Sequence, residues 1–374
     1  MSWTSWADGE LETIRESGRW RDTRPFDCLG PTGELAGTGT VTSFASNDYL
    51  GLTTHPEVIA AAHEALDRYG TGSGASRLVV GTRSLHEQLE VELADWKGTE
   101  AALVFATGFA ANLGVLATFT GPGVSVLSDE LNHASIIDGC RLARSNVTVY
   151  RHGDIDQLRR RVRQGERAVV VTDSVFSMDG DTADLATLAT FCAATGALLI
   201  IDEAHAVLGP ELPEGSGSEV LRVGTLSKSL GSLGGFVAGP RPMIDLLRNR
   251  ARPFIFTTAP TPADTAAALA ALRIARSAEG EQLRDRLRAH IELLRAGHPS
   301  PIVPVVLGGE EEALTASAWL LDRGFLVPAI RPPTVPVGTS RLRVALSAAH
   351  RDAAVADLAA ALAELREREA AGAA

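Results

Sequence analysis

Short apolar runs alternate with helix-length amphipathic segments between residue 101 and about residue 240. The apolar runs predict seven strands, at 101–106, 124–128, 147–150, 168–173, 197–202, 220–224 and 235–238. Because helix-length segments separate most of these runs, the pattern predicts an α/β fold with a large, mostly parallel seven-stranded sheet and helices on both faces. In such sheets, ligands bind beyond the carboxyl ends of the strands. Candidate chemistry is therefore expected where each strand ends.

The segments on either side of this pattern predict smaller units. Residues 3–24 place Trp3, Trp6 and Trp20 among charged residues, which predicts an amphipathic helix, and a short strand is expected at 41–45. Residues 300–374 predict a small α+β unit, with strands at 302–307, 325–328 and 342–345 and helices at 310–323 and 352–368. We expect three segments: an N-terminal helix and strand at 1–45, a large α/β domain at 46–290 and a small α+β domain at 291–374.

Composition narrows the class of protein. The 374 residues are 45% hydrophobic and 22% charged, which is ordinary for a soluble globular enzyme. A net charge of −11 argues against broad binding to nucleic acid or to anionic membranes. The three cysteines lack metal-ligand spacing, so we expect reduced core thiols and no metal site. The N-terminus lacks the apolar core of a signal peptide, and no apolar run is long enough to cross a bilayer, so a cytoplasmic location is expected.

The chain contains only two lysines, Lys97 and Lys228. Arginine stays charged at ordinary pH, so these two are the only side-chain amines available as nucleophiles. Lys97 ends an amphipathic run before Gly98, which predicts a solvated helix terminus. Lys228 lies within the small-residue segment 224–231, where a bulky partner can approach closely. Lys228 is therefore the candidate for amine chemistry.

Asp202 ends a predicted strand close to Lys228. A carboxylate there can keep a pyridinium nitrogen protonated, and the aldehyde of pyridoxal phosphate needs a lysine. Asp202 and Lys228 meet both requirements, although a lone Asp at this position can instead cap the following helix. Gly108 follows a strand and opens a helix whose free amides suit a phosphate. His133 also follows a strand, and it either stacks on a ring or simply begins a helix.

Eight motifs occur in an order and spacing that is highly specific as a set. They are SNDYLGL (46–52), GSGASR (72–77), TGFAAN (107–112), NHASIIDG (132–139), VFSMDGD (175–181), IDEAH (201–205), TLSKSLGSLGG (225–235) and IRPPTVPVGTSRLR (330–343). On these motifs, the chain resembles the α-oxoamine synthases, a branch of the fold-type-I pyridoxal-phosphate enzymes. The resemblance runs from about residue 3 to the last helix and implies a PLP-dependent acyltransferase.

The resemblance implies cofactor roles for the matching residues. Lys228 would hold the cofactor aldehyde and later remove the substrate Cα proton. Asp202 would pair with the pyridine nitrogen and His133 would stack on the ring, while His205 and Ser177 would bind its 3′ oxygen. The implied catalytic residues are Lys228, His133, Asp202 and His205. The implied cofactor-binding residues are Gly108, Phe109, His133, Ser177, Asp202, His205, Thr225, Ser227, Lys228, Thr257 and Thr258. Thr257 and Thr258 would reach a phosphate across the interface of a homodimer.

The resemblance also implies substrates. Arg343 would bind the carboxylate of an amino acid, a role that suits a bidentate guanidinium. The implied substrate-binding residues are Arg21, Asn47, Ser76, His133, Thr334 and Arg343. The string at 330–336 favours L-alanine with a pimeloyl thioester, carried by coenzyme A or by an acyl carrier protein, in a decarboxylative condensation.

Two alternatives stay open. A glycine C-acetyltransferase, or another member of the family, is the first, because the loop after His205 is short where the family has a glycine-rich segment. The shortened loop lies near the site and bears on the choice of acyl donor. A binding protein that kept the fold and lost activity is the second, and the retention of Lys228, Asp202, His133 and Arg343 argues against it.

Overall fold

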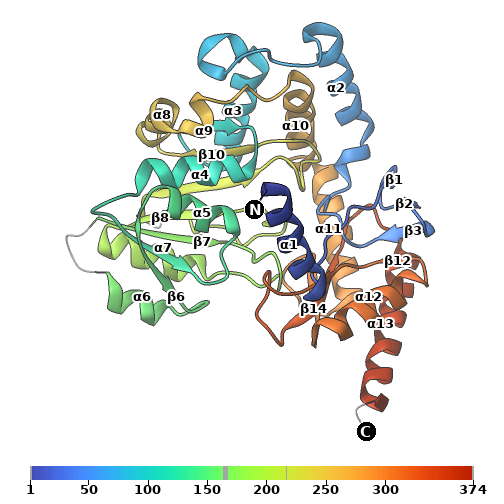
Figure 1. The fold of residues 1–374 in the computed structure, drawn as a ribbon. Coiled ribbons are helices and arrows are strands. Elements are labelled where there is room, and N and C mark those ends of the chain that lie inside the picture. Colours follow the sequence, from blue (N-terminus) through green and yellow to red (C-terminus); the bar gives the residue numbers. More distant parts are fainter. Residues whose placement is uncertain (1, 163–166, 216, 373–374) are drawn as a thin grey trace.

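The computed structural model describes residues 2–162, 167–215 and 217–372. Its largest sheet has seven strands, as predicted, in the order β4-β10-β9-β8-β7-β5-β6 (Figure 1). The strands are β4 (Ala101–Phe105), β5 (Ser125–Asp129), β6 (Asn146–Tyr150), β7 (Ala168–Asp173), β8 (Leu198–Asp202), β9 (Val220–Thr225) and β10 (Gly235–Gly239). Strands β6, β5, β7, β8 and β9 are parallel, whereas β10 pairs antiparallel with both β9 and β4. The sheet is therefore mostly parallel, with one reversed strand inside it.

Helices cover both faces of this sheet because its strands are apolar on both sides. Val169 and Val171 of β7 contact one layer of helices, and Val170 between them contacts the other. The first layer contains α4 (Gly108–Phe119), α5 (Ala134–Leu142), α8 (Arg241–Arg250) and α9 (Arg252–Ile255). The second contains α2 (Pro56–Tyr69), α3 (Ser84–Trp96) and α10 (Pro262–Ala275) towards β4, and α6 (Ile155–Arg161) and α7 (Leu185–Thr195) towards β6.

A second core lies at the C-terminal end of the chain. It contains the sheet β11-β14-β13 and three helices. Their bounds are β11 (Ile302–Gly308), β13 (Ala329–Ile330), β14 (Ser340–Ala345), α11 (Ala278–Leu294), α12 (Glu310–Leu321) and α13 (Asp352–Gly372). Phe44 and Tyr49, from the start of the chain, are fully buried in this core. The strands and helices predicted after residue 300 are confirmed, and the division into three segments at residues 45 and 290 stays a prediction.

The N-terminal segment pairs with the C-terminal part of the chain. Strands β1 (Phe26–Cys28), β2 (Thr32–Leu35) and β3 (Gly39–Ser43) form an antiparallel meander, and β12 (Phe325–Leu326) pairs with β3 in parallel. Helix α1 (Trp3–Glu16) ends well before residue 24 and buries none of its residues. Cys28 is exposed, so the prediction of a core thiol is wrong there and holds only for Cys140 and Cys192.

Two further short turns connect the elements before the large sheet. One is the single 3₁₀ turn η1 (Leu52–Thr54), and the other is the π-helical turn η2 (Arg77–Gly81) that follows the glycine-rich loop at 70–76. The loop and η2 lie beside the segment that follows α9, because Ser76 forms an isolated bridge with Thr258. Residues 180 positions apart in the chain are thereby brought together.

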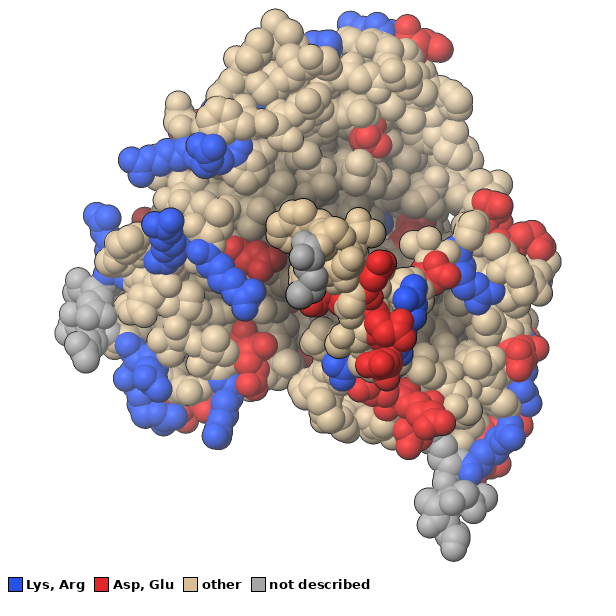
Figure 2. Space-filling model, in the orientation of Figure 1, with Lys and Arg blue, Asp and Glu red and all other residues tan. Residues whose placement is uncertain are grey.

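Charged side chains of both signs are interspersed on the face shown in Figure 2. The basic groups at its lower left lie over α6, whose Arg159, Arg160 and Arg161 are all exposed. These three arginines form a solvated helix face. Among the described residues, no helix combines the length and the apolar character that a membrane span requires.

The prediction for Lys97 is wrong. Lys97 is 8% exposed, its Nζ lies 2.8 Å from Glu203 Oε2, and the ammonium stands 3.8 Å from the centre of the Trp96 ring. Helix α3 ends against the face of the large sheet, where Arg222 of β9 donates a hydrogen bond to the Lys97 carbonyl oxygen. The local sequence resembles a solvated helix end because the charged partner of Lys97, Glu203, lies 106 positions further along the chain, directly after β8.

His152 joins the end of β5 to the turn that follows β7. Its Nδ1 lies 3.1 Å from Asp129 Oδ1, and its Nε2 lies 2.5 Å from Asp181 Oδ2. Hydrogen bonds to Asp129 and then to Asp181 raise the pKa of His152 to about 10, against the opposing effect of burial. The charged imidazolium therefore holds the turn that carries Ser177.

The substitution His152→Gln is expected to lower stability in a pH-dependent way. The pKa of His152 is raised on folding from about 6.5, so its contribution is complete below pH 6.5 and is lost as pH rises through about 10. We expect a melting temperature about 2–4 °C below that of the wild type at pH 6.5, with a smaller difference at pH 10. Differential scanning calorimetry at both values measures it, and a pH-independent difference would contradict the charge-based account.

Candidate active site

A cavity of about 250 Å³ lies beyond the carboxyl ends of β7, β8 and β9, beside the N-termini of α4 and α5. All nine residues predicted to hold a cofactor within one chain line it: Gly108, Phe109, His133, Ser177, Asp202, His205, Thr225, Ser227 and Lys228. Four lining residues with polar side chains were not among the predicted site residues: Thr107, Asn112, Ser135 and Asp173. The fold thus brings together residues that are up to 120 positions apart in the chain.

Two carboxyl groups stand on neighbouring strands at the floor of this cavity. Asp173 and Asp202 are register partners in β7 and β8, and both are buried. Asp202 Oδ2 accepts a hydrogen bond from Asn112 Nδ2 at 2.6 Å, and its Oδ1 accepts one from the Ala204 amide at 2.9 Å. Among the described residues between Asp202 and β9 no helix begins, so the helix-cap alternative is wrong. Burial, and then the charge of Asp202, hold the pKa of Asp173 well above its usual value. This shift favours the protonated form of Asp173, whereas Asp202 faces the cavity.

Lys228 projects into the same cavity from the loop after β9. Its Nζ lies 2.9 Å from His205 Nε2. Burial lowers the pKa of Lys228, while the nearby charges of Asp202 and Asp173 oppose this effect. A lowered pKa increases the share of neutral amine at a given pH, and only the neutral amine is a nucleophile. The environment of Lys228 therefore suits amine chemistry.

A chain of hydrogen bonds runs from Lys228 to Arg343. Tyr49 Oη lies 2.6 Å from His205 Nδ1 and donates to Asn47 Oδ1 at 3.0 Å. Asn47 Oδ1 also accepts from Arg343 Nη2 at 3.1 Å. Because the Tyr49 proton goes to Asn47, His205 must donate from Nδ1, which leaves Nε2 as an acceptor towards Lys228. Tyr49 thus sets the tautomer of His205.

Charge and burial favour one protonation state for each of two titratable groups in this series of hydrogen bonds, His205 and Tyr49. Burial, then Lys228 and Arg343, hold the pKa of His205 well below its usual value, so the ring is neutral. Burial raises the pKa of Tyr49 to about 12, so its hydroxyl stays protonated. Arg343 Nε also donates to the Ser177 carbonyl oxygen at 2.5 Å, which places its guanidinium beside the turn after β7.

The substitution Tyr49→Phe is expected to lower kcat by about tenfold while cofactor content stays close to that of the wild type. It leaves the buried Nδ1 of His205 without its partner, which costs about 1–3 kcal/mol and frees the other tautomer. Steady-state kinetics across pH 6–9 measures the effect. A purely structural role would lower the melting temperature and leave the pH profile of kcat unchanged, and that outcome would contradict the tautomer assignment.

His133 forms one wall of the cavity and also begins α5. Its Nδ1 lies 2.7 Å from Ser135 Oγ, and its backbone amide donates to Asp173 Oδ2 at 3.0 Å. The Phe109 ring meets it edge to face, with centroids 6.4 Å apart. Burial lowers the pKa of His133, which favours the neutral ring. His133 begins α5 and also lines the cavity, so the helix-start role and the ring-stacking role predicted for it are compatible.

The opposite wall provides a cradle for an anion. Helix α4 begins at Gly108, where the Phe109 amide is one of the free N–H groups, and Thr225 and Ser227 place their hydroxyl oxygens 2.7 Å apart beside it. A Cβ on Gly235 would lie 2.4 Å from the Gly108 nitrogen, so only glycine lets β10 pass the helix start this closely. This cradle suits a phosphate at one end of a flat ring.

The remaining predicted residues lie elsewhere. Asn47 and Arg343 join the hydrogen-bond chain described above. Arg21 and Thr334 line a separate cavity of about 120 Å³ together with Arg19 and Arg331. Ser76 and Thr258 form a bridge with each other, and neither they nor Thr257 line the Lys228 cavity. That Thr257 and Thr258 reach the phosphate of a partner subunit's site therefore stays a prediction.

Comparison with known proteins identifies the family. The model of aminotransferase class I and II matches residues 39–362. An 8-amino-7-oxononanoate synthase from Methylobacterium sp. (strain 4-46) is 50% identical over 98% of this chain and 97% of its own length. One from Anaeromyxobacter dehalogenans (strain 2CP-1) is 49% identical over 96% of this chain and 94% of its own. The chain belongs to the α-oxoamine synthases. A serine palmitoyltransferase of the same family from S. paucimobilis, solved with bound PLP and myriocin, superposes with a TM-score of 0.90 at 32% identity over 98% of this chain and 99% of its own.

The cofactor of this α-oxoamine synthase is pyridoxal phosphate, and the cavity fits it. The cradle at α4 matches a phosphate, Asp202 lies where an acid can face a pyridine nitrogen, and Lys228 supplies the amine. Asn112, Tyr49 and Asp173 support this set and were missed by the sequence reasoning. The sequence did contain a signal for each of them. Asn112 lies in TGFAAN, Tyr49 lies in SNDYLGL, and Asp173 ends a predicted strand.

Proposed function

We propose that this α-oxoamine synthase condenses L-alanine with a pimeloyl thioester, releasing carbon dioxide and the thiol and forming 8-amino-7-oxononanoate, a step of biotin biosynthesis. The observation that carries the proposal is identity of 49–50% with synthases of that name over almost the entire chain. The retained Lys228, Asp202, His133 and Arg343 in connected positions support a working enzyme over a silent binding protein.

In this proposal, Lys228 holds the cofactor aldehyde, and Thr225, Ser227 and the amides of Gly108 and Phe109 hold the phosphate. Asp202 faces the pyridine nitrogen, and His133 packs on the ring. His205 and Ser177 bind the ring oxygen. Bound pyridoxal phosphate supplies an electron sink that stabilises negative charge at the amino-acid Cα.

Lys228 is also the proposed base for the Cα proton. A group that both accepts and returns a proton works best when its pKa lies near the working pH, and burial lowers the pKa of Lys228 in that direction. Arg343 binds the alanine carboxylate, held in place by Asn47 and the Ser177 carbonyl oxygen. Arg21, Asn47, Ser76 and Thr334 contact the acyl or carboxylate parts of the substrates.

We infer that the protein works as a homodimer with the site at the interface. Exposed apolar side chains support this: Leu78, Val79 and Val80 of η2 are 52–72% exposed, and Phe256 beside Thr257 is 70% exposed. The Ser76–Thr258 bridge brings these two segments together, so their apolar side chains lie close to each other. Thr257 and Thr258 then reach the phosphate of the partner's site. A cytoplasmic location is part of the proposal and agrees with three cysteines that form no disulfide.

A panel of substrates tests the function. L-alanine or glycine is combined with pimeloyl-CoA, acetyl-CoA or succinyl-CoA, and pimeloyl-acyl carrier protein is added as a second pimeloyl donor. Free thiol is then followed. We expect release with L-alanine and a pimeloyl thioester, at a kcat/KM at least about a hundredfold above the other pairs. Preference for glycine with acetyl-CoA would instead identify a glycine C-acetyltransferase. Absence of thiol release from every pair, in protein that carries the cofactor, would favour the silent binding protein.

A further inference from the structure

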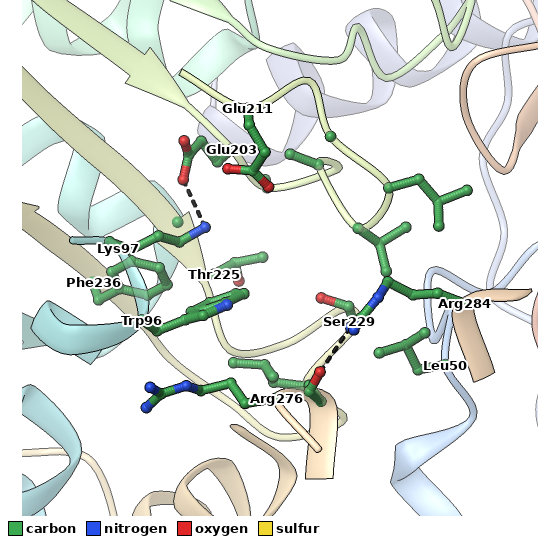
Figure 3. A pocket seen from close by; sticks show the side chains of 18 of the residues that line it. Leu50, Trp96, Lys97, Glu203, Glu211, Thr225, Ser229, Phe236, Arg276 and Arg284 are labelled. Carbon is green, nitrogen blue, oxygen red and sulfur yellow. Dashed lines mark hydrogen bonds and ion pairs between the residues drawn. The ribbon is translucent and has the colours of Figure 1, made fainter. Parts of the chain in front are cut away.

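The largest described cavity, about 440 Å³, lies outside the candidate active site. It occupies the second helix layer of the large sheet, between the end of α3, the short loop after His205, the end of α10 and the middle of α11 (Figure 3). Ala204, Gly224 and Thr225 line both cavities, so the two share a wall at the ends of β8 and β9. A volume of this size is typical of small-molecule sites.

The lining combines a charged part with an apolar wall. Trp96 and Phe236 form an aromatic pair with centroids 6.3 Å apart, and they stand beside the Lys97 side chain in Figure 3. Aliphatic side chains from three other segments complete the wall: Leu50, Val207, Leu208 and Leu230. A ligand here would bury an apolar body.

One buried charge in the wall is incompletely matched. Lys97 and Arg222 are two buried cations that share a single buried carboxylate, Glu203, at 2.8 Å and 2.7 Å. The other acid near Arg222 is Glu211, at 3.4 Å, and its side chain is 79% exposed and therefore screened by solvent. The triad thus carries a surplus of about one positive charge, which is costly to bury without an anion.

The surplus is located at Lys97. The Arg222 guanidinium also donates to the Lys97 carbonyl oxygen, whereas the Lys97 ammonium has three N–H donors and Glu203 as its one polar partner among the described residues. The arginines at the rim are already paired: Arg284 and Arg288 contact Glu281, and Arg276 contacts Asp95. A ligand anion would therefore bind at Lys97, inside the cavity.

We propose that this cavity binds a medium-chain aliphatic monocarboxylate, with its carboxylate on Lys97 and its chain against Trp96, Phe236 and the aliphatic wall. One surplus positive charge matches one carboxylate, whereas a phosphate dianion would leave an excess negative charge buried. The apolar wall favours a ligand with an aliphatic chain over a small hydrophilic anion, because the small anion would leave that wall in contact with water.

Binding to the cofactor-loaded enzyme tests the proposal, with octanoate, octanamide, acetate and inorganic phosphate as probes in isothermal titration calorimetry. We expect octanoate to bind at least about tenfold more tightly than octanamide, which lacks the charge, and than acetate, which lacks the chain. Equal affinity for octanoate and octanamide, tighter binding of phosphate, or no binding of octanoate would overturn the proposal.

Variants locate the site. Lys97→Met keeps the length of the side chain, removes the charge and leaves Glu203 paired with Arg222, so octanoate affinity is expected to fall at least about tenfold. Leu208→Trp fills the cavity without touching the charged triad and is expected to give the same loss, which keeps the test open should Lys97→Met fail to fold. Arg273→Met, on α10 and paired with Glu92 outside this cavity, is the matched control and is expected to bind as the wild type does.

The substitution Arg343→Met tests whether octanoate binds in this cavity or in the candidate active site. It removes the cation expected to hold a carboxylate there, so octanoate affinity is expected to stay unchanged. Loss of binding in Arg343→Met together with unchanged binding in Lys97→Met would place octanoate beside Lys228 and overturn the proposal.

Discussion

Replacing Lys228 with alanine is expected to lower turnover by at least about a thousandfold and to remove the visible absorbance of the holoenzyme. Two roles are lost at once, the covalent hold on the cofactor aldehyde and the base for the Cα proton, and general-base catalysis alone contributes about 10²–10⁴. Lys97 provides no substitute amine, since it lies in the neighbouring cavity and is paired with Glu203. Thiol release and absorbance spectra of the purified variant measure both effects.

Ser229→Ala is the matched control for this result. Ser229 follows Lys228 in the chain and does not line the candidate active site, so we expect turnover within about threefold of the wild type. A Lys228→Ala enzyme that retains the absorbance of the wild type would contradict the assignment of Lys228, since no other described amine lies in that cavity.

Replacing Asp202 with asparagine is expected to give the second largest effect, a fall in kcat of about 10²–10³. The change keeps the shape of the side chain and removes its charge. A carboxylate facing the pyridine nitrogen raises the pKa of that nitrogen and keeps it protonated, which makes the ring a stronger electron sink. Steady-state kinetics with L-alanine and a pimeloyl thioester measures the loss.

Asp173→Asn provides a paired comparison on the neighbouring strand. The raised pKa of Asp173 favours its neutral form, and asparagine reproduces a neutral acceptor for the His133 amide. We expect kcat to fall by less than about tenfold. Equal losses in Asp173→Asn and Asp202→Asn would show that the charge is not specific to Asp202.

The large sheet could be predicted from the sequence because each of its strands is short, apolar and bounded by polar residues. Polar motifs after those strands had to converge at one edge of the sheet, which explains why Asp202, His133 and Lys228 could be placed together. The resemblance to a known family then supplied their expected roles. These predictions rest on local pattern and on general sheet geometry.

What the sequence left out depends on contacts between distant segments. Asn112 is an ordinary residue of an apolar helix until the fold brings Asp202 within 2.6 Å of its side chain. Tyr49 belongs to a predicted turn, yet it lies fully buried in the C-terminal core and touches His205 from there. Lys97 gains its partner only when the end of α3 meets Glu203, the residue that follows β8. No local pattern encodes such pairs.

The pairing of β3 with β12 bears on how the protein is made. Strand β3 ends at Ser43 and its partner begins at Phe325, so about 280 residues separate the two halves of one small sheet. At a synthesis rate of about 5–20 residues per second, the N-terminal strands wait roughly 15–60 s for that partner to leave the ribosome. Asn47 likewise waits for Arg343. The nascent chain can form its central sheet early, but it acquires a complete site only when synthesis is almost finished.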